Sequence, residues 1–401
     1  MSWERFRDLL ADEPLPAALV DLDALDHNRD VLLGKLGGAR GVDGKPVSLR
    51  IASKSVRSVA ILGHLLDAAG VDGVMTMSPR EAAFLCSHGI DDLLVAYPTC
   101  RMADARPLTG ALAEGKRVWL PVDCTEHVHL LGDLATAAGV TVQACLDVDV
   151  SLRPLGSLVH VGVRRSPVRT VADAVGVAQA VEETAGVELS AVLAYEAQAA
   201  GLPDRTGSPM DPFMRLMKRR SERLAAERRG AIVAALRDRG HPIRVVNGGG
   251  TGTVGATGND GSVTEVTAGS GFYCPHLFDG YDALPLRPAA FFAVAVARRS
   301  DPGFVTCAFG GYTASGSIGS DRLPRVHLPA GLRPVGLEGW GEVQTPLRVP
   351  AGVDLGLGDP VIARHAKAGE LCERFDTLLL VRGDAVVDRV PTYRGMGHAF
   401  G

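Results

Sequence analysis

Short apolar runs of β type alternate with segments of helical spacing through the first two thirds of the chain. We expect eight strands there, at residues 47–52, 73–77, 92–96, 117–122, 142–149, 188–195, 243–247 and 263–268. The segments between them are rich in Ala, Leu, Arg and Glu. Eight strands alternating with helices over roughly 230 residues favour a closed barrel over an open doubly wound sheet. The sequence therefore predicts an α/β fold, a (β/α)8 barrel of the TIM type.

The chain changes character after Tyr281. The β-type runs there are broken by Gly and Pro, and no long helical segment follows. We expect an antiparallel β domain of roughly 115 residues, completed by the N-terminal arm, which ends in a predicted strand at 17–22. A helix with Asp23 as its N-cap is expected to follow that strand. The predicted domains are the barrel, 24–281, and the β domain, 282–401 with 1–23.

Composition excludes several classes of protein. The chain has 42 Lys and Arg against 46 Asp and Glu, a balance that argues against a nucleic-acid surface. Its start mixes both charges without the apolar core of a signal peptide, and no later segment approaches the length of a membrane span. Seven cysteines without paired spacing indicate neither a disulfide framework nor a structural zinc site. We expect a cytoplasmic protein that binds neither nucleic acid nor membrane.

The stretch VSLRIASKSVRS places Lys54 at the carboxyl end of the first predicted barrel strand. Barrel enzymes keep their chemistry at that end, and a lysine there can form a Schiff base. A lone lysine is more often solvated, so other motifs must support a catalytic role. Surface solvation is also the default expectation for Arg50, Arg57, Arg164 and Arg165, although any of them could hold a substrate carboxylate.

Two glycine-rich turns follow the seventh and eighth predicted strands. They read NGGGTGT at 247–253 and AGSG at 268–271, and Thr251 and Ser270 add hydroxyl groups. Glycines also make ordinary tight turns, but two such loops at consecutive strand ends favour a phosphate site, because bare backbone N–H groups can approach an anion. A phosphate site facing a lysine suggests pyridoxal phosphate. A sugar phosphate bound as a Schiff base also fits, although barrel aldolases more often carry the lysine on a later strand.

The motifs LVDLDALDHN, RIASKSVRS, NGGGTGT and AGSGFY, in this order and before a β domain, resemble the alanine-racemase-like, fold-type III pyridoxal phosphate enzymes. Within them the chain is similar to the D-threonine aldolase and D-serine dehydratase branch, and most to actinobacterial proteins described as amino acid deaminase/aldolase. The resemblance implies Lys54 as the Schiff-base lysine and a homodimer whose active sites are finished by the partner's β domain. It also implies a set of cofactor-binding residues: Arg153, Tyr195, Asn247, Gly249, Gly250, Thr251, Ser270, Gly271 and Phe272.

Two of these positions carry further expectations. LDVDVSLR looks like a family segment that would put Arg153 near the phenolic oxygen of the cofactor, although PLGSLVH is inserted after it. Tyr195, in AYEAQ, would lie near the pyridine ring, with Gln198 at the rim of the site. Tyr195 could equally be an ordinary core residue.

The sequence departs from the resembled branch at His365. Members of that branch hold a divalent metal with His-x-Cys or His-x-Asp near this point, whereas here Lys367 stands two residues after His365. A protonated lysine cannot ligate a metal, and one imidazole binds weakly, so we expect no metal. Cys372 turning back toward His365 is the alternative. Lys367 would supply positive charge to the substrate where the metal stood, or would only pair with Glu370.

The predicted function is a pyridoxal phosphate-dependent lyase for small β-hydroxy amino acids of D configuration. Aldol cleavage would use a base such as His365 on the β-hydroxyl, and dehydration would use Lys54 as the base at Cα. The missing metal favours aldol cleavage, because hydroxide expulsion would lose its Lewis acid. One alternative is an amino acid racemase or epimerase, with Tyr312 of the partner as second base. The other is a non-catalytic carrier of pyridoxal phosphate, although such carriers usually consist of the barrel alone.

Overall fold

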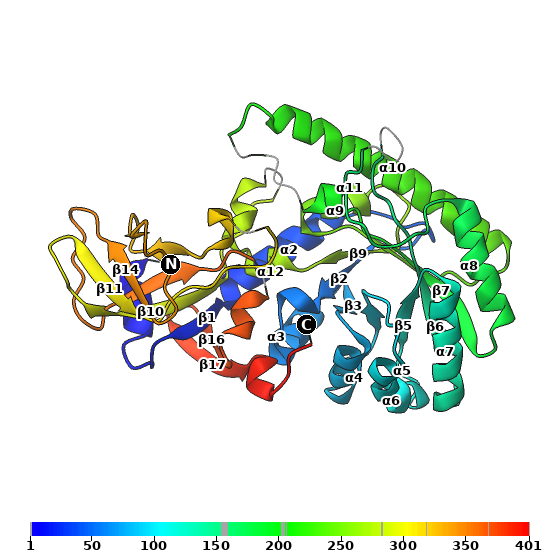
Figure 1. The fold of residues 1–401 in the computed structure, drawn as a ribbon, viewed down its shortest axis with the longest axis horizontal. Helices are drawn as coiled ribbons and strands as arrows, with labels where there is room; N and C mark the ends of the chain where they lie inside the picture. The colour runs from blue at the N-terminus through cyan, green and yellow to red at the C-terminus, as the bar shows by residue number, and fades with distance from the viewer. Residues whose placement is uncertain are drawn as a thin grey trace.

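The computed structural model describes residues 2–153, 159–201, 205, 207–281, 284–317, 319–367 and 369–400. It has two units that lie beside each other along the long axis of the molecule (Figure 1). One is a closed barrel of eight parallel strands, which confirms the predicted fold. The barrel strands, in order around the barrel, are β2 Ser48–Ala52, β3 Val71–Thr76, β4 Leu93–Val95, β5 Val118–Val122, β6 Val142–Asp147, β7 Val187–Ala194, β8 Val245–Gly248 and β9 Glu265–Ala268.

Helices surround the barrel, and their amphipathic faces follow from the helical spacing seen in the sequence. On α7, for example, Val128, Leu131 and Leu134 point to the core. The α-helices are α1 Trp3–Leu9, α2 Leu22–Leu36, α3 Val59–Leu66, α4 Pro79–Ser87, α5 Met102–Ala105, α6 Thr109–Ala113, α7 Thr125–Ala138, α8 Val171–Glu183, α9 Ala197–Ala200, α10 Asp211–Asp238, α11 Val254–Gly258 and α12 Ser270–Tyr273. Short 3-10 turns are η1 Ser53–Ser55, η2 Arg106–Leu108, η3 Thr251–Thr253, η4 His276–Gly280, η5 Ser320–Arg322, η6 Glu370–Glu373 and η7 Arg394–Met396.

The second unit is a nine-stranded sheet built from the C-terminal part of the chain and the N-terminal arm. Strand β1 lies between β10 and β16, so the arm completes the sheet as predicted. The sheet is antiparallel except for the parallel pair of β1 and β16. Its strands are β1 Ala17–Asp21, β10 Ala290–Arg298, β11 Phe304–Ala308, β12 Arg325–Leu328, β13 Arg333–Pro334, β14 Gln344–Arg348, β15 Pro360–Arg364, β16 Thr377–Arg382 and β17 Ala385–Pro391.

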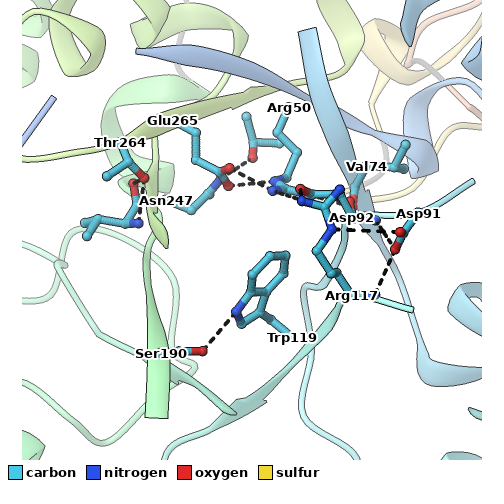
Figure 2. Close-up of polar contacts among 12 residues, drawn as sticks. Arg50, Val74, Asp91, Asp92, Arg117, Trp119, Ser190, Asn247, Thr264 and Glu265 are labelled. Atoms are coloured by element: carbon cyan, nitrogen blue, oxygen red, sulfur yellow. Dashed lines mark hydrogen bonds and ion pairs between the residues drawn. The ribbon is translucent and has the colours of Figure 1, made fainter. Parts of the chain in front are cut away.

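A polar network lies inside the barrel (Figure 2). Arg50 on β2 is 1% exposed, and its guanidinium donates to Glu265 (2.6 Å) and to Asp92 (2.6 Å). Asn247 on β8 donates to the same Glu265 carboxylate (2.7 Å). Burial by itself lowers the pKa of Arg50, and the two carboxylates more than offset this and raise it. Arg50 is therefore a buried structural cation, and its predicted solvation was wrong.

Two further observations concern the chain outside the barrel. Helix α2 is capped by Asp21, whose carboxylate accepts from the Ala24 amide (3.0 Å), so the predicted cap at Asp23 was wrong by two residues. Asp23 lies in the first turn instead, where its carboxylate pairs with Arg382. No helix in the described ranges has the length and apolarity needed to cross a membrane.

Candidate active site

Lys54 lies at the mouth of the barrel, in η1 directly after β2, with an exposed side chain. The serines on both sides of it are buried. The Ser53 hydroxyl donates to the Met75 carbonyl (2.9 Å), and Nε of Arg57 donates to the Lys54 carbonyl (3.0 Å). These bonds fix the backbone of the loop while the amine stays accessible. Lys54 thus has the position that the sequence predicted.

Both glycine loops lie beside the turn Ser53–Ser55 that carries Lys54, here called the lysine loop. The Thr251 hydroxyl accepts from the backbone amides of Gly271 (3.1 Å) and Gly269 (3.4 Å), which ties the loop after β8 to the loop after β9. The hydroxyls of Ser270 and Ser55 lie 3.5 Å apart, and Ser55 is the neighbour of Lys54. Three hydroxyl groups and two amides therefore converge beside the lysine.

Glycine is required in these loops by close approach. A Cβ on Gly269 would lie 2.6 Å from the Ser55 hydroxyl, and one on Gly271 would lie 2.7 Å from Cγ2 of Thr251. Both distances are shorter than real Cβ contacts, so neither position accepts a side chain without displacing its neighbour. A cradle lined by the hydroxyls of Ser55, Thr251 and Ser270, where the glycines add no Cβ atoms, offers donors that a phosphate can use.

Tyr195 lies beside the glycine loop that follows β8. It follows β7 and is half-buried, and a Cβ on Gly250 would lie 3.1 Å from Cε2 of its ring. Burial raises the pKa of Tyr195 to about 12, so the phenol is neutral at physiological pH. The Arg165 guanidinium lies 5.8 Å from the centre of the Tyr195 ring and 5.3 Å from that of Tyr97. Arg165 was expected to be an ordinary solvated arginine, and this position between two aromatic rings was not predicted.

Glu196 and Arg229 are supporting residues that the sequence reasoning missed. Glu196 is 1% exposed and accepts from the Gly249 amide (3.0 Å) and the Thr257 hydroxyl. The Arg229 guanidinium is fully buried and lies 3.6 Å from the Glu196 carboxylate. Together they hold the turn in which Gly249 takes a φ of +73°. The sequence signal for Glu196 was its position directly after the sixth predicted strand.

Four predicted cofactor or rim residues already have polar partners within the protein. Asn247 belongs to the polar network inside the barrel. The side chain of Phe272 is fully buried, and its carbonyl accepts from Asn28 (2.9 Å). Gln198 is also buried and donates to the Val150 carbonyl (2.8 Å), and it lines a small pocket together with Tyr195 and Arg165.

Arg153 is the fourth of these residues. It pairs with Asp149 (3.1 Å), which also pairs with Arg169. Arg165, and not Arg153, is the arginine that contacts the Tyr195 ring. The inserted segment PLGSLVH that follows Arg153 falls largely outside the described residues.

The segment after β15 is pressed against the lysine loop. Gly369 has a φ of +87°, and a Cβ on it would overlap the Lys54 carbonyl oxygen. Arg57 pairs with Glu373 and is 9% exposed, so the solvated position expected for it was wrong. Burial lowers the pKa of Arg57. The β unit therefore contributes directly to the surroundings of Lys54.

Lys367 belongs to this segment and is half-buried. Its ammonium donates to the Ser315 hydroxyl (2.8 Å), and the Ser315 amide donates to the Glu370 carboxylate (2.9 Å). Burial lowers the pKa of Lys367, Glu370 opposes this shift, and the charge of Lys54 adds to it. Lys54 and Lys367 are thus close enough to repel each other electrostatically.

His365 and Tyr312 do not reach the mouth. His365 has no exposed surface, and burial, with repulsion from Arg364 and His276, lowers its pKa to about 3. The role of base predicted for His365 has no support in this placement. Tyr312 is buried in its own chain beneath the Arg374 guanidinium, which lies 5.1 Å from the ring centre. The predicted use of Tyr312 by a partner subunit therefore lacks an exposed hydroxyl.

A lysine-bearing (β/α)8 barrel joined to a β-sheet unit that contains the N-terminal strand defines a class of architecture, that of the alanine-racemase-like proteins. Three solved structures with this fold are similar to the chain. D-threonine aldolase from Filomicrobium marinum superposes with a TM-score of 0.79 at 23% identity, covering 96% of both chains. D-threo-3-hydroxyaspartate dehydratase from Delftia sp. HT23 gives 0.71 at 19%, covering 96% of this chain and 99% of the other.

The third structure is alanine racemase from Clostridium difficile 630, with a TM-score of 0.64 at 15% identity, covering 95% of this chain and 99% of the other. No protein-family model and no curated protein sequence matches the chain. The shared fold is the one that the motifs around Lys54 predicted.

Proposed function

We propose that the chain is a pyridoxal phosphate-dependent lyase acting on small β-hydroxy amino acids, with a preference for the D configuration. The observation that carries this proposal is the exposed amine of Lys54 beside a cradle of hydroxyls and glycine amides. The fold supports it, since two proteins with this fold are named for action on β-hydroxy amino acids of D configuration.

The cradle fits the phosphate of the cofactor. The hydroxyls of Ser55, Thr251 and Ser270 would hold it, and because the amides of Gly269 and Gly271 donate to the Thr251 oxygen, the Thr251 hydroxyl proton is left to donate to the phosphate. When bound, pyridoxal phosphate supplies an aldehyde carbon that links to amines and a conjugated ring that accepts electrons from a bond broken at Cα. The aromatic ring of Tyr195 borders the same loops and would limit the space around the cofactor ring.

Lys54 and Lys367 divide the remaining tasks. The amine of Lys54 would hold the cofactor and would also be the group that accepts or returns a proton at Cα of the substrate. Lys367, held by Ser315, supplies positive charge near that position. Since burial and the charge of Lys54 lower its pKa, Lys367 can also release its proton and accept the β-hydroxyl proton, the task first assigned to the buried His365. Arg165 is available for the substrate carboxylate.

The protein reconstituted with pyridoxal phosphate provides the test. D-threonine, D-serine and their L enantiomers are supplied, and glycine, aldehyde, keto acid and ammonia are quantified. Aldol cleavage yields glycine and an aldehyde, and dehydration yields a keto acid and ammonia. The Lys54→Ala variant is expected to lose all product and also the absorbance band of lysine-bound cofactor, which lies near the boundary of the visible and the ultraviolet. An unchanged absorbance band in this variant would overturn the proposal.

Two alternatives are separated by the same preparation. A racemase would exchange Cα hydrogen with deuterated water and invert the substrate without a carbonyl product, but the hydroxyl of Tyr312, its proposed second base, is buried. A non-catalytic carrier would release no product from any amino acid. The contact of Gly369 with the lysine loop argues against a carrier, because the β unit then has a task at the site.

The homodimer and the lack of a divalent metal at His365 are also proposals. Light scattering of the purified holoenzyme measures the first. Dialysis against a chelator measures the second, and we expect the product yield to be unchanged, since Lys367 occupies the position of the second ligand in the branch that the sequence resembles.

A further inference from the structure

A cysteine, a histidine and an aspartate meet at a different part of the barrel mouth from Lys54. Cys100 lies in the loop after β4, Asp123 follows β5 directly, and His127 lies in the first turn of α7. Strands β4 and β5 are neighbours in the barrel, whereas Lys54 follows β2. None of these three residues has a task in the proposed lyase reaction.

The imidazole of His127 links the other two side chains. Its Nδ1 lies 2.9 Å from the Asp123 carboxylate, and its Nε2 lies 3.3 Å from the Cys100 sulfur. The side chains of Asp123 and His127 are each 11% exposed, while Cys100 is exposed. This order of nucleophile, base and orienting carboxylate is the arrangement that activates a thiol in enzymes.

We propose that Cys100 is a nucleophilic thiol activated by His127 and Asp123, and a site of oxidation by small peroxides. His127 takes the thiol proton at Nε2, and the Asp123 carboxylate, 2.9 Å from Nδ1, pairs with the charged ring that results. The thiolate attacks one peroxide oxygen, so that an S–O bond forms and the O–O bond breaks. Sulfur is oxidised by two electrons and the peroxide is reduced. The departing hydroxide takes the proton from Nε2 and leaves as water.

The electrostatics of the cluster agree with this geometry. The hydrogen bond to Asp123 raises the pKa of His127 to about 9, burial opposes this shift, and Cys100 adds to it. A protonated imidazole is therefore favoured beside the Cys100 sulfur. The other cysteines offer a contrast, since burial raises the pKa of the thiols of Cys86 and Cys274 to about 11.

A bound metal is the competing use of this cluster. The donor atoms of Asp123, Cys124 and His127 lie within 4.8 Å of one another. Both ring nitrogens of His127 are already engaged, however, one by Asp123 and one by Cys100. A metal would have to displace one of these contacts, because a ring nitrogen that binds a metal cannot also donate a proton. The observed geometry favours the activated thiol.

The experiment measures the rate at which each cysteine of the holoenzyme reacts. Iodoacetamide and hydrogen peroxide are added separately at neutral pH, and peptide mass spectrometry follows alkylation and the addition of oxygen at Cys100 and Cys124. We expect Cys100 to react fastest and His127→Gln to slow it by about tenfold, because an unassisted thiol is only a few per cent thiolate at pH 7. His129→Gln, at an exposed position of the same helix, is the matched control and should leave the rate unchanged.

Circular dichroism and thermal unfolding establish that the variants are folded, and Asp123→Asn gives a second, milder loss of rate. A Cys100 rate equal to that of Cys124, or unaffected by His127→Gln, would overturn the proposal. Protection of both cysteines by one equivalent of Zn²⁺ would overturn it in favour of a metal site. Neither result depends on lyase activity, so the test stands apart from the proposed function.

Discussion

His365 offers the most direct test of how burial controls the chemistry of this site. The histidine is 0% exposed, and its pKa is lowered to about 3, whereas a histidine in an unfolded chain titrates near 6.5. Between these values only the unfolded chain binds the proton. The contribution of His365 to the free energy of unfolding is therefore complete above pH 6.5. It is lost as the pH falls toward 3, by about 1.4 kcal/mol per pH unit. From pH 7 to pH 5 the loss attributable to His365 is about 2 kcal/mol.

His365→Leu removes this titration and should flatten the pH dependence. Urea unfolding of the native protein and the variant at pH 7, 6 and 5 yields the free energy of unfolding of each. The difference between the two proteins should change by about 2 kcal/mol across this range. His129→Leu, at an exposed position, is the control and should leave the slope unaltered. Equal losses in the native protein and His365→Leu would show that the imidazole is protonated in the folded state, and the argument against its role as base would fail.

Three other changes test the surroundings of Lys54. Glu265→Gln breaks the buried ion pair with Arg50 and should lower the free energy of unfolding by about 3 to 5 kcal/mol, measured by urea titration. A loss below about 1 kcal/mol would contradict the burial of the Arg50 charge. Gly271→Ala places a Cβ 2.7 Å from Thr251 and should weaken pyridoxal phosphate binding at least tenfold in an absorbance titration, while unchanged affinity would remove this loop from the cradle. Lys367→Met should lower kcat of the lyase reaction by about 10²-fold or more with cofactor binding unchanged, and full activity would exclude Lys367 from catalysis.

The sequence was sufficient for features encoded by local pattern. Alternation of short apolar runs with helical segments predicted the eight barrel strands, and each glycine loop follows the strand that was expected before it. Lys54 was located for the same reason, because a charge that ends an apolar run falls at a strand end. Each of these predictions depends only on residues that are neighbours along the chain.

The burial of individual polar residues could not be predicted from local sequence pattern. Arg50, Gln198 and His365 were assigned to the surface or the site, and all three are buried by contacts with residues far away in the chain. One signal was available for Arg50. It alternates with buried Leu49 and Ile51 on β2, so its side chain points into the barrel, where another strand had to supply a carboxylate.

The position of β1 bears on how the chain is made. This strand precedes the barrel in the chain, yet its partners in the sheet, β10 and β16, follow the whole barrel. At 5 to 20 residues per second, the roughly 270 residues between β1 and β10 take on the order of 15 to 50 s to synthesise. During that time the backbone of Ala18, Leu19 and Val20 has neither of its partner strands. The barrel can therefore be complete on the ribosome before β1 has either of its partner strands, so the sheet is closed only after the barrel.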